Sequence, residues 1–494
     1  MLTEIITTVL TAIVLFCGFV KWKYKYWERL NIASMPAEFP YGSLKNCILM
    51  KETIGETLAR FYRKFNDKKL MGFYGPLEPM ILLRDPELIK QVLIKDFNSF
   101  CDGGLTVRKH IDPLLAYNPF GEKGLERWKA SRSMHTQNLT ISKLKAMSVD
   151  MIRSAENMTK YIRTKCDAGT LEVKSLVRNY AVDLALSSVF GVESDSFFKE
   201  NATYTKFTKG EMFVDSNQAN FAVLSGFFAP TVGRIFRWRT LSKYVEKMII
   251  DLYKSCAEYR KKHNIVRADF LQYVMTVVSK AEQENKKFSD AKIAALCISV
   301  YGDAVDSSSP ALTYALYHIA SDCRVQEKLR TEIMNSIKDM SELDLDKLQT
   351  MEYLEMVISE TLRLHPPIQI LSRTCTKSIN LDGLQIEPGR KLFVTLYGLH
   401  MDPKYYTEPD KFLPERFSKE QRTDMNKMAY LPFGEGPRMC LGFRFGMLEI
   451  KIGIVAILSK FCIKTANPKG YKCDNGSLFL TSPKGDVDIT FTPL

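Results

Sequence analysis

The chain has 494 residues, of which 46% are apolar, and it carries a formal net charge of +13. After the first forty residues it contains no Gly/Ser-rich or Pro-rich linker, fixed-period repeat or low-complexity tract, which favours one large helix-rich domain over several small ones. The positive charge fits an anionic membrane surface or an acidic protein partner, as well as a plain solvated surface. Nucleic acid is not an expected partner, because no zinc-finger spacing or RNA-binding aromatic signature is present. The eleven cysteines form no CxxC pair, which indicates reduced thiols facing the cytosol rather than a disulfide scaffold.

The N-terminus has the features of a membrane anchor. Ile5 to Val20 is uncharged and mostly apolar, and it nearly reaches the roughly 20 residues that a spanning helix needs. Basic and aromatic residues follow at once, namely Lys21, Trp22, Lys23, Tyr24, Lys25, Tyr26, Trp27 and Arg29. This mixture is favoured at the membrane interface and keeps the bulk of the chain in the cytosol. A cleaved signal peptide would need a positive n-region and a small-residue cleavage site, and neither is present. We expect an anchor in residues 1–20, a basic and proline-containing hinge in 21–40, and one folded domain in 41–494.

The rest of the chain is dominated by helical periodicity. Apolar residues recur at helical spacing in 144–165, 173–191, 240–263, 266–282, 289–320, 322–338 and 347–364. Strand-like runs are short, at 79–83, 367–372, 379–386 and 391–397. The order is no regular βαβ alternation, and no dinucleotide-binding or Walker sequence appears. The predicted fold is mainly α with a minor β-sheet region, and the chain carries no nucleotide-binding domain of its own.

The most informative stretch is the loop that ends at Cys440. It reads LPFGEGPRMCLG over residues 431–442 and runs into an apolar helix from Phe443 to about Phe461. A cysteine at a helix N-terminus is favoured as a thiolate. Gly442 lets the backbone lie against a flat group, Phe433 can shield that group, and Arg438 can pair with an anion. A lone cysteine here would more often be structural, but a ferric porphyrin with carboxylate side chains would use all of these features together.

Five residues, Phe433, Gly436, Arg438, Cys440 and Gly442, stand at FxxGxRxCxG spacing. In this motif the chain resembles the cytochrome P450 family, and Gly72 to Gly75 and Arg84 to Glu87 are similar to insect microsomal members. The resemblance implies a P450-type fold with haem b, iron protoporphyrin IX, buried between the central long helix and the Cys-loop helix. It also implies that Cys440 is the axial ligand of the haem iron, with the other four residues around the cofactor.

Two further groups of residues match the family in order and distance. Glu360 and Arg363 share a helix face, and Arg416 follows in a later loop; the resemblance implies that the three form a buried structural clamp, since buried charges must be mutually satisfied. Trp128, Arg132 and Arg373 are implied to contact the haem propionates. Each of these alone would more often be an ordinary surface residue.

The family's oxygen-activating segment is altered in this chain. The alignment rests on Ala315 to Tyr317, and it places Asp303 where the family has a small residue and Ala304 where it has glycine. Asp306 keeps the acid, whereas Ser307 replaces threonine and keeps only the hydroxyl. Pro310 removes an N–H that would bond to the Asp306 carbonyl and favours a kink. Two interpretations follow: Asp306 and Ser307 form a catalytic proton relay, or Asp303 has shifted the protein to another haem-thiolate reaction or ended turnover.

The resemblance implies a monooxygenase of the endoplasmic-reticulum membrane with its catalytic domain, residues 41–494, facing the cytosol. It would insert one oxygen atom from O₂ into an apolar xenobiotic, lipid or hormone-like molecule, with electrons from NADPH–cytochrome P450 reductase and in some cases cytochrome b5. The charges expected to receive the reductase are Arg438, Arg444, Lys451, Arg127 and Lys129. The segments expected to line the substrate pocket are 101–125, 205–230, 299–307, 367–371 and 478–481. The alternative is an atypical haem-thiolate protein with isomerase or dehydratase activity or with lost turnover.

Overall fold

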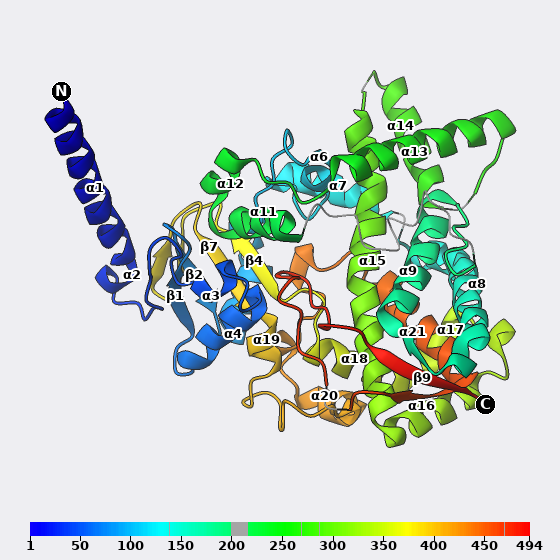
Figure 1. Cartoon of the computed structure of the whole chain (residues 1–494). Helices are drawn as coiled ribbons and strands as arrows, with labels where there is room; N and C mark the ends of the chain where they lie inside the picture. Colours follow the sequence, from blue (N-terminus) through cyan, green and yellow to red (C-terminus); the bar gives the residue numbers. More distant parts are fainter. Residues whose placement is uncertain (138, 199–215, 268, 286, 469) are drawn as a thin grey trace.

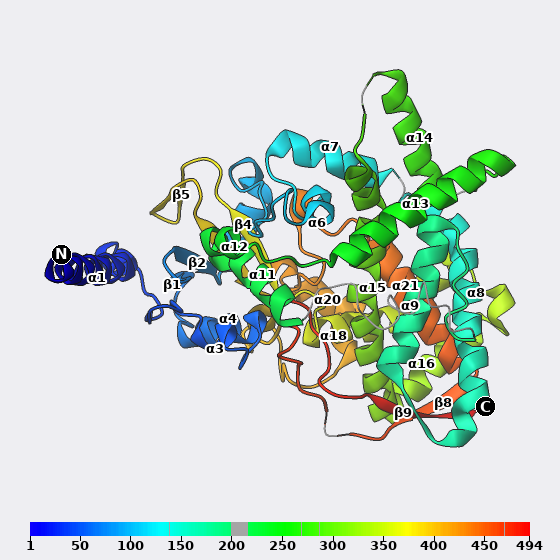
Figure 2. The same cartoon turned by 45° about the horizontal axis from the view of Figure 1, so that its top comes forward.

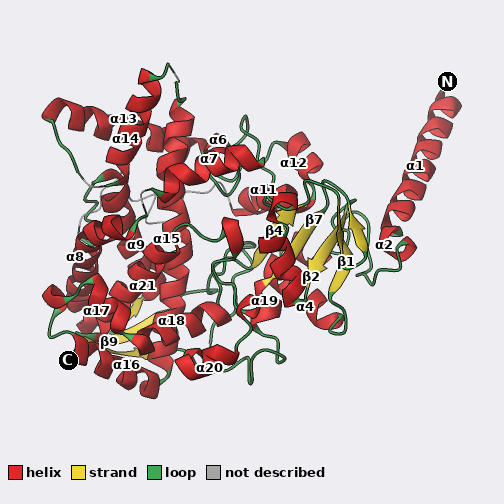
Figure 3. Cartoon of the chain, turned by 180° about the vertical axis from the view of Figure 1, so that it is seen from behind, coloured by secondary structure: helices red, strands yellow, loops and turns green. Residues whose placement is uncertain are grey.

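A helix-rich body, a group of strands at one side of it and a projecting N-terminal helix make up the molecule (Figure 1). The computed structural model describes residues 1–494 except 138, 199–215, 268, 286 and 469. Seen from behind, the strands of the largest sheet gather at the side of the body nearest the N-terminal helix, whereas the C-terminal strand Asp488–Pro493 lies with the long helices on the opposite side (Figure 3). The mainly α fold with a minor β-sheet region is therefore confirmed.

The elements follow one another in a mostly helical order. The helices are α1 (Leu2–Tyr24), α2 (Tyr26–Arg29), α3 (Lys45–Ile48), α4 (Ile54–Lys64), α5 (Pro86–Lys90), α6 (Pro113–Tyr117), α7 (Leu125–Thr136), α8 (Ile141–Lys165), α9 (Val173–Phe190), α11 (Ser216–Phe228), α12 (Pro230–Phe236), α13 (Lys243–His263), α14 (Phe270–Gln283), α15 (Asp290–Ser321), α16 (Cys323–Ser336), α17 (Leu345–Thr350), α18 (Glu352–Leu364), α19 (Leu396–His400), α20 (Lys419–Asp424) and α21 (Phe443–Leu458). The strands are β1 (Leu70–Tyr74), β2 (Pro79–Leu83), β3 (Thr170–Glu172), β4 (Ile370–Thr374), β5 (Ile379–Leu381), β6 (Leu384–Ile386), β7 (Lys391–Thr395), β8 (Phe461–Thr465) and β9 (Asp488–Pro493).

The helix predicted over 347–364 is in fact two helices. α17 ends at Thr350, Met351 is non-helical, and α18 begins at Glu352. The Glu332 carboxylate of α16 accepts the backbone N–H groups of Tyr353 and Leu354 at 2.8 and 2.9 Å. Such a bond from another helix satisfies N–H groups that a helix start leaves unpaired. Apolar periodicity does not reveal this break, because both pieces bury the same kind of face.

The largest sheet has the strand order β1-β2-β7-β4. β7 pairs parallel to β2 and antiparallel to β4, with Arg373 opposite Leu392. The strand predicted over 391–397 stops at Thr395, because the Thr395 hydroxyl accepts the Gly398 N–H at 3.1 Å and starts α19. The sheet thus presents Arg373 on a rigid strand that leads toward the interior of the molecule.

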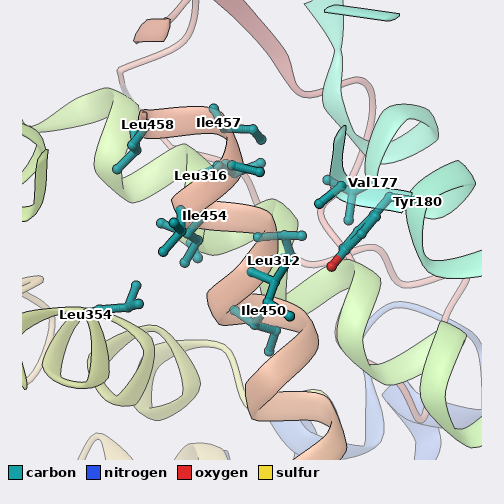
Figure 4. Packing of buried hydrophobic residues seen from close by; sticks show 14 of the residues in the cluster. Val177, Tyr180, Leu312, Leu316, Leu354, Ile450, Ile454, Ile457 and Leu458 are labelled. Carbon is teal, nitrogen blue, oxygen red and sulfur yellow. The ribbon is translucent and has the colours of Figure 1, made fainter. Parts of the chain in front are cut away.

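A large cluster of buried hydrophobic residues lies where the helices α15, α21 and α9 meet (Figure 4). Leu312 of α15, Ile450 and Ile454 of α21 and Tyr180 of α9 are all buried. A side chain at Gly453 would bring its Cβ within 2.7 Å of a Leu312 methyl, so the two long helices approach as closely as they do only because this residue is glycine. α15 continues through Pro310 over 32 residues, with α13 and α14 alongside its N-terminal half (Figure 2).

The N-terminal helix α1 leaves the body and exposes most of its apolar surface (Figure 1). It is long and apolar enough to cross a membrane, with a mean hydropathy of 2.0 over its most apolar window. It runs to Tyr24, four residues into the stretch predicted as hinge. Trp27, which was expected at the membrane interface, is instead 1% exposed. Its ring packs over Gly72, and its indole N–H donates to the Phe73 carbonyl at 3.1 Å, so Trp27 fixes the base of the helix to β1.

Candidate active site

The loop before α21 holds Cys440 in a fixed turn. The Cys440 N–H donates to the Phe433 carbonyl at 2.8 Å, and Gly434 and Gly436 have φ values of 70° and 75°. A Cβ on Gly436 would stand 2.2 Å from the Leu93 carbonyl oxygen, so this position accepts glycine alone. The predicted loop residues Phe433, Gly436, Arg438, Cys440 and Gly442 are thus brought together in one turn.

Cys440 and Asp303 are close enough for the charge of Asp303 to affect the pKa of Cys440. Both side chains keep free surface, yet burial raises the pKa of the Cys440 thiol to about 11 and that of the Asp303 carboxyl to about 7. A side chain that has accessible surface, but whose pKa is raised by removal from bulk water, is expected to face a space inside the protein. The Asp303 charge further raises the pKa of Cys440, whereas the Gly442 N–H and Arg132 lower it. Asp303 on α15 and Cys440 on the loop therefore face the same space.

Three arginines surround this space without a carboxylate partner among the residues that the structure describes. Arg132 donates to the Met439 carbonyl at 2.8 Å, and Arg438 donates to the carbonyls of Cys101, Pro119 and Glu122. Arg373 is 7% exposed, its Nε has no hydrogen-bond partner in the described chain, and burial and the nearby Arg438 charge lower its pKa to about 9. A buried guanidinium group without a counter-charge, as in Arg373, is unfavourable and would be stabilised by a bound anion.

These features fit a haem. The unpaired arginines match the two propionates, and the Cys440 thiol faces the space between them. Gly442 has an ordinary φ of −86°, and a Cβ on it would meet no protein atom within 4 Å. Neither backbone strain nor protein packing therefore explains the glycine at this position. The close approach of a flat ring explains it. Trp128 is 4% exposed and stacks near Arg438, whose guanidinium carbon lies 4.7 Å from the indole ring.

The predicted clamp is assembled and fully hydrogen-bonded. Arg363 and Glu360 are both fully buried and joined by two bonds of 2.7 and 2.8 Å, and Arg416 reaches the same carboxylate at 3.2 Å. Glu360 also accepts the Leu413 N–H at 2.9 Å. The remaining N–H groups of Arg363 donate to the carbonyls of His400, Pro409 and Lys411. A buried ion set is tolerated when every member is satisfied in this way.

His400 connects the clamp to the cysteine loop, although no sequence motif marks this residue. Its Nε2 accepts the Leu431 N–H at 3.0 Å, so its Nδ1 is the protonated nitrogen that donates to the Arg363 carbonyl at 3.1 Å. Burial lowers the pKa of His400 to about 3, which keeps the ring neutral and this tautomer fixed. The first residue of the cysteine loop is thereby held against the helix that carries Glu360.

The two predicted catalytic residues in the altered segment of α15, Asp306 and Ser307, have different hydrogen-bonding or ion-pair partners. Asp306 forms an ion pair with Arg178 of α9 at 3.0 Å. The Ser307 hydroxyl donates to the Asp303 carbonyl at 2.7 Å, so its proton is used within the helix. Asn118 of the 101–125 loop was also missed; its amide donates to the Asp303 carboxylate at 3.1 and 3.4 Å.

The comparisons with known proteins agree with this geometry. The family model described as Cytochrome P450 matches residues 36–488. The chain is 31% identical over 472 residues to the probable cytochrome P450 6a13 of Drosophila melanogaster, covering 93% of this chain and 92% of that one. It is 29% identical to cytochrome P450 6k1 of Blattella germanica, over 95% of this chain and 93% of the relative. The chain belongs to the cytochrome P450 family. It is therefore a P450 monooxygenase that uses haem b, O₂, an organic substrate and a redox partner reductase.

Replacing the clamp carboxylate should destabilise the whole proximal side. In Glu360→Gln the two arginines remain buried without their counter-charge, and we expect a loss of about 3–5 kcal/mol of folding free energy. Urea unfolding of the purified protein, together with its haem content, measures this effect. The matched control is Glu352→Gln on the same helix, which removes an exposed ion pair with Lys419 and should change little. Equal stability of the two variants would contradict the structural role of the clamp.

Proposed function

We propose that this enzyme inserts one oxygen atom from O₂ into an apolar small molecule of xenobiotic, lipid or hormone-like character, with electrons from NADPH through a reductase. The observation that carries the proposal is the convergence of Cys440 and three arginines without carboxylate partners, among the described residues, on one interior space. The haem supplies oxygen activation when bound, and a thiolate ligand favours cleavage of the O–O bond.

The residues that hold the cofactor are assigned by their contacts. Cys440 would bind the haem iron, and the iron would stabilise the thiolate in a site where burial raises the pKa of the thiol. Arg132, Arg373 and Arg438 pair with the propionates, and Trp128 supports Arg438. Phe433 shields the ring, while Gly436 and Gly442 give the loop its turn and its close approach. Glu360, Arg363 and Arg416 support the loop from behind without touching the substrate.

The substrate pocket is assigned to segments that meet beside this space. Phe479 packs against Phe120 at 6.1 Å and against Phe227 at 5.3 Å between ring centroids. Ile368 forms an isolated bridge with Leu480. These contacts join 101–125, α11, 367–371 and 478–481, and they support the assignment of the pocket to these segments. Residues 205–215 of the predicted lining lie outside the described residues. Phe227 and Phe228 are almost fully buried, so they belong to the core.

The relay is assigned to Asp306 and Ser307. Asp306 pairs with Arg178 at 3.0 Å, and its second oxygen, Oδ2, has no hydrogen-bond partner in the described chain. The Ser307 oxygen can accept a proton and pass it into the space. The departure at Asp303 favours a second candidate, a haem-thiolate isomerase or dehydratase or a protein without turnover. Reductase-dependent NADPH consumption in the presence of substrate separates the two candidates.

The reductase is expected on the outer face of the cysteine loop. Arg444 is exposed and can attract an acidic partner. Arg127 and Lys129 are exposed as well, although they pair with Glu122 at 3.7 Å and with Glu126 at 3.3 Å. Two other expected charges are used within the protein: Arg438 points inward to backbone carbonyls, and Lys451 pairs with Glu355 at 2.7 Å. Cytochrome b5 would compete for the same basic face.

The axial ligand is tested by Cys440→Ala. We expect the ferric protein to lose the electron paramagnetic resonance signature of thiolate-bound low-spin haem, because Cys440 carries the only thiol of this loop and the thioether of Met439 cannot form a thiolate. Cys462→Ala, at an exposed cysteine on β8, is the matched control and should leave the spectrum unchanged. A thiolate signature that survives in Cys440→Ala would refute the assignment.

The relay is tested by Asp306→Asn. Loss of the acid should lower product formation about 100-fold, within the range of general acid catalysis, and should raise the solvent deuterium isotope effect. The thiolate spectrum should stay intact, since the side chain keeps its size. An unchanged isotope effect would assign Asp306 a structural role only.

The membrane proposal places α1 in the endoplasmic-reticulum bilayer with the catalytic domain in the cytosol, because basic residues follow the apolar helix. Deleting residues 2–24 should move the protein from the membrane pellet to the supernatant after carbonate extraction. Protease added to intact microsomes should cleave the full-length domain from outside. Protection of the domain would reverse the proposed orientation.

A further inference from the structure

Asp303 is held in place by an amide whose orientation is determined by its other bond. The Asn118 side chain is 4% exposed, and its Oδ1 accepts the Phe120 N–H at 2.7 Å. Its NH₂ group must therefore be the end that faces Asp303. The two contacts of 3.1 and 3.4 Å use only part of the carboxylate's capacity to accept hydrogen bonds. The rest of the carboxylate faces the interior space.

This carboxylate has no cationic partner among the described residues. Asp306, three residues along the same helix, has Arg178 at 3.0 Å, whereas no lysine, arginine or histidine forms an ion pair with Asp303 in the part of the chain that the structure describes. Asp306 adds a like charge nearby, and Cys440 lies across the space. A carboxylate removed from bulk water without a counter-charge is unfavourable, so a cation entering the space gains a partner that the protein does not supply.

We propose that Asp303, positioned by Asn118, is a specificity-determining residue that recognises a cationic nitrogen on an otherwise apolar organic substrate. The proposal rests on the proposed function, because the space is the one assigned to substrate. One carboxylate and one amide are too few for a metal ion, and no group of three or more metal-ligating side chains exists among the described residues. The aromatic rings of Phe120 and Phe479 suit the apolar body of such a ligand. Aromatic rings also attract organic cations.

The test compares two probes of equal shape and different charge. Benzyltrimethylammonium carries a permanent positive charge and cannot coordinate iron, and neopentylbenzene is its neutral carbon isostere. The dissociation constant of each is measured from the change in the Soret band on titration of the full-length haem protein. The quantity of interest is the ratio of the neutral to the cationic constant, because the apolar contribution cancels in it.

Two variants remove the charge in different ways. Asp303→Asn keeps the side-chain size, whereas Asp303→Ala shortens the side chain. The test can be made with either variant, so it still works if one of them fails to bind haem. We expect the ratio to fall at least tenfold in either, a factor that corresponds to about 1.4 kcal/mol. Asp290→Asn, at the exposed start of the same helix, is the matched control and should keep the wild-type ratio.

A ratio that stays within twofold of wild type in both Asp303 variants would overturn the inference, as would a wild-type protein that does not bind the cationic probe. The carbon monoxide difference spectrum is recorded for each protein first. If wild type lacks a thiolate-ligated band, the proposed function itself has failed. If the band is present and the ratio does not change, only the role of Asp303 is lost.

Discussion

The burial of charge around one sulfur atom is the constraint on which the rest of the structure depends. Behind the cysteine loop, Glu360 pairs with both Arg363 and Arg416, and the remaining hydrogen bonds of the arginines go to backbone carbonyls. In front of it, Arg132, Arg373 and Arg438 have no carboxylate partners in the described chain. The clamp around Glu360 is satisfied by protein groups alone, whereas the three arginines need an anionic ligand as their counter-charge. The fold thus separates a charge set that supports structure from one that holds a cofactor.

The hydrogen bonds of His400 show how the two sets are coupled. A neutral imidazole links the Arg363 carbonyl to the Leu431 N–H, so the loop that carries Cys440 begins from a rigid point. Gly436 then permits the tight approach to Leu93. Each of these contacts positions the sulfur without any charge being left unsatisfied behind it. The close packing of α15 on α21 through Gly453 sets the distance to the opposite wall, where Asp303 and Ser307 lie.

Much of this could be predicted from the sequence, because the signals are local. Helical periodicity gave α8 and α15 nearly to their ends, and the spacing from Phe433 to Gly442 marked the loop. Contacts set by tertiary packing could not be predicted. The break at Met351 depends on Glu332 of another helix, Trp27 is buried through a glycine on β1, and the Asn118–Asp303 contact joins residues 185 positions apart. Arg438 looked like a docking charge because its motif does not say which way the side chain points.

The most direct test of the account is the carbon monoxide difference spectrum of the reduced wild-type protein. A thiolate from Cys440 donates electron density to the iron, and the account predicts the strongly red-shifted Soret band that this ligand gives. A band at the position typical of histidine or neutral thiol ligation, or a purified protein that holds no haem despite ample supply during expression, would contradict it.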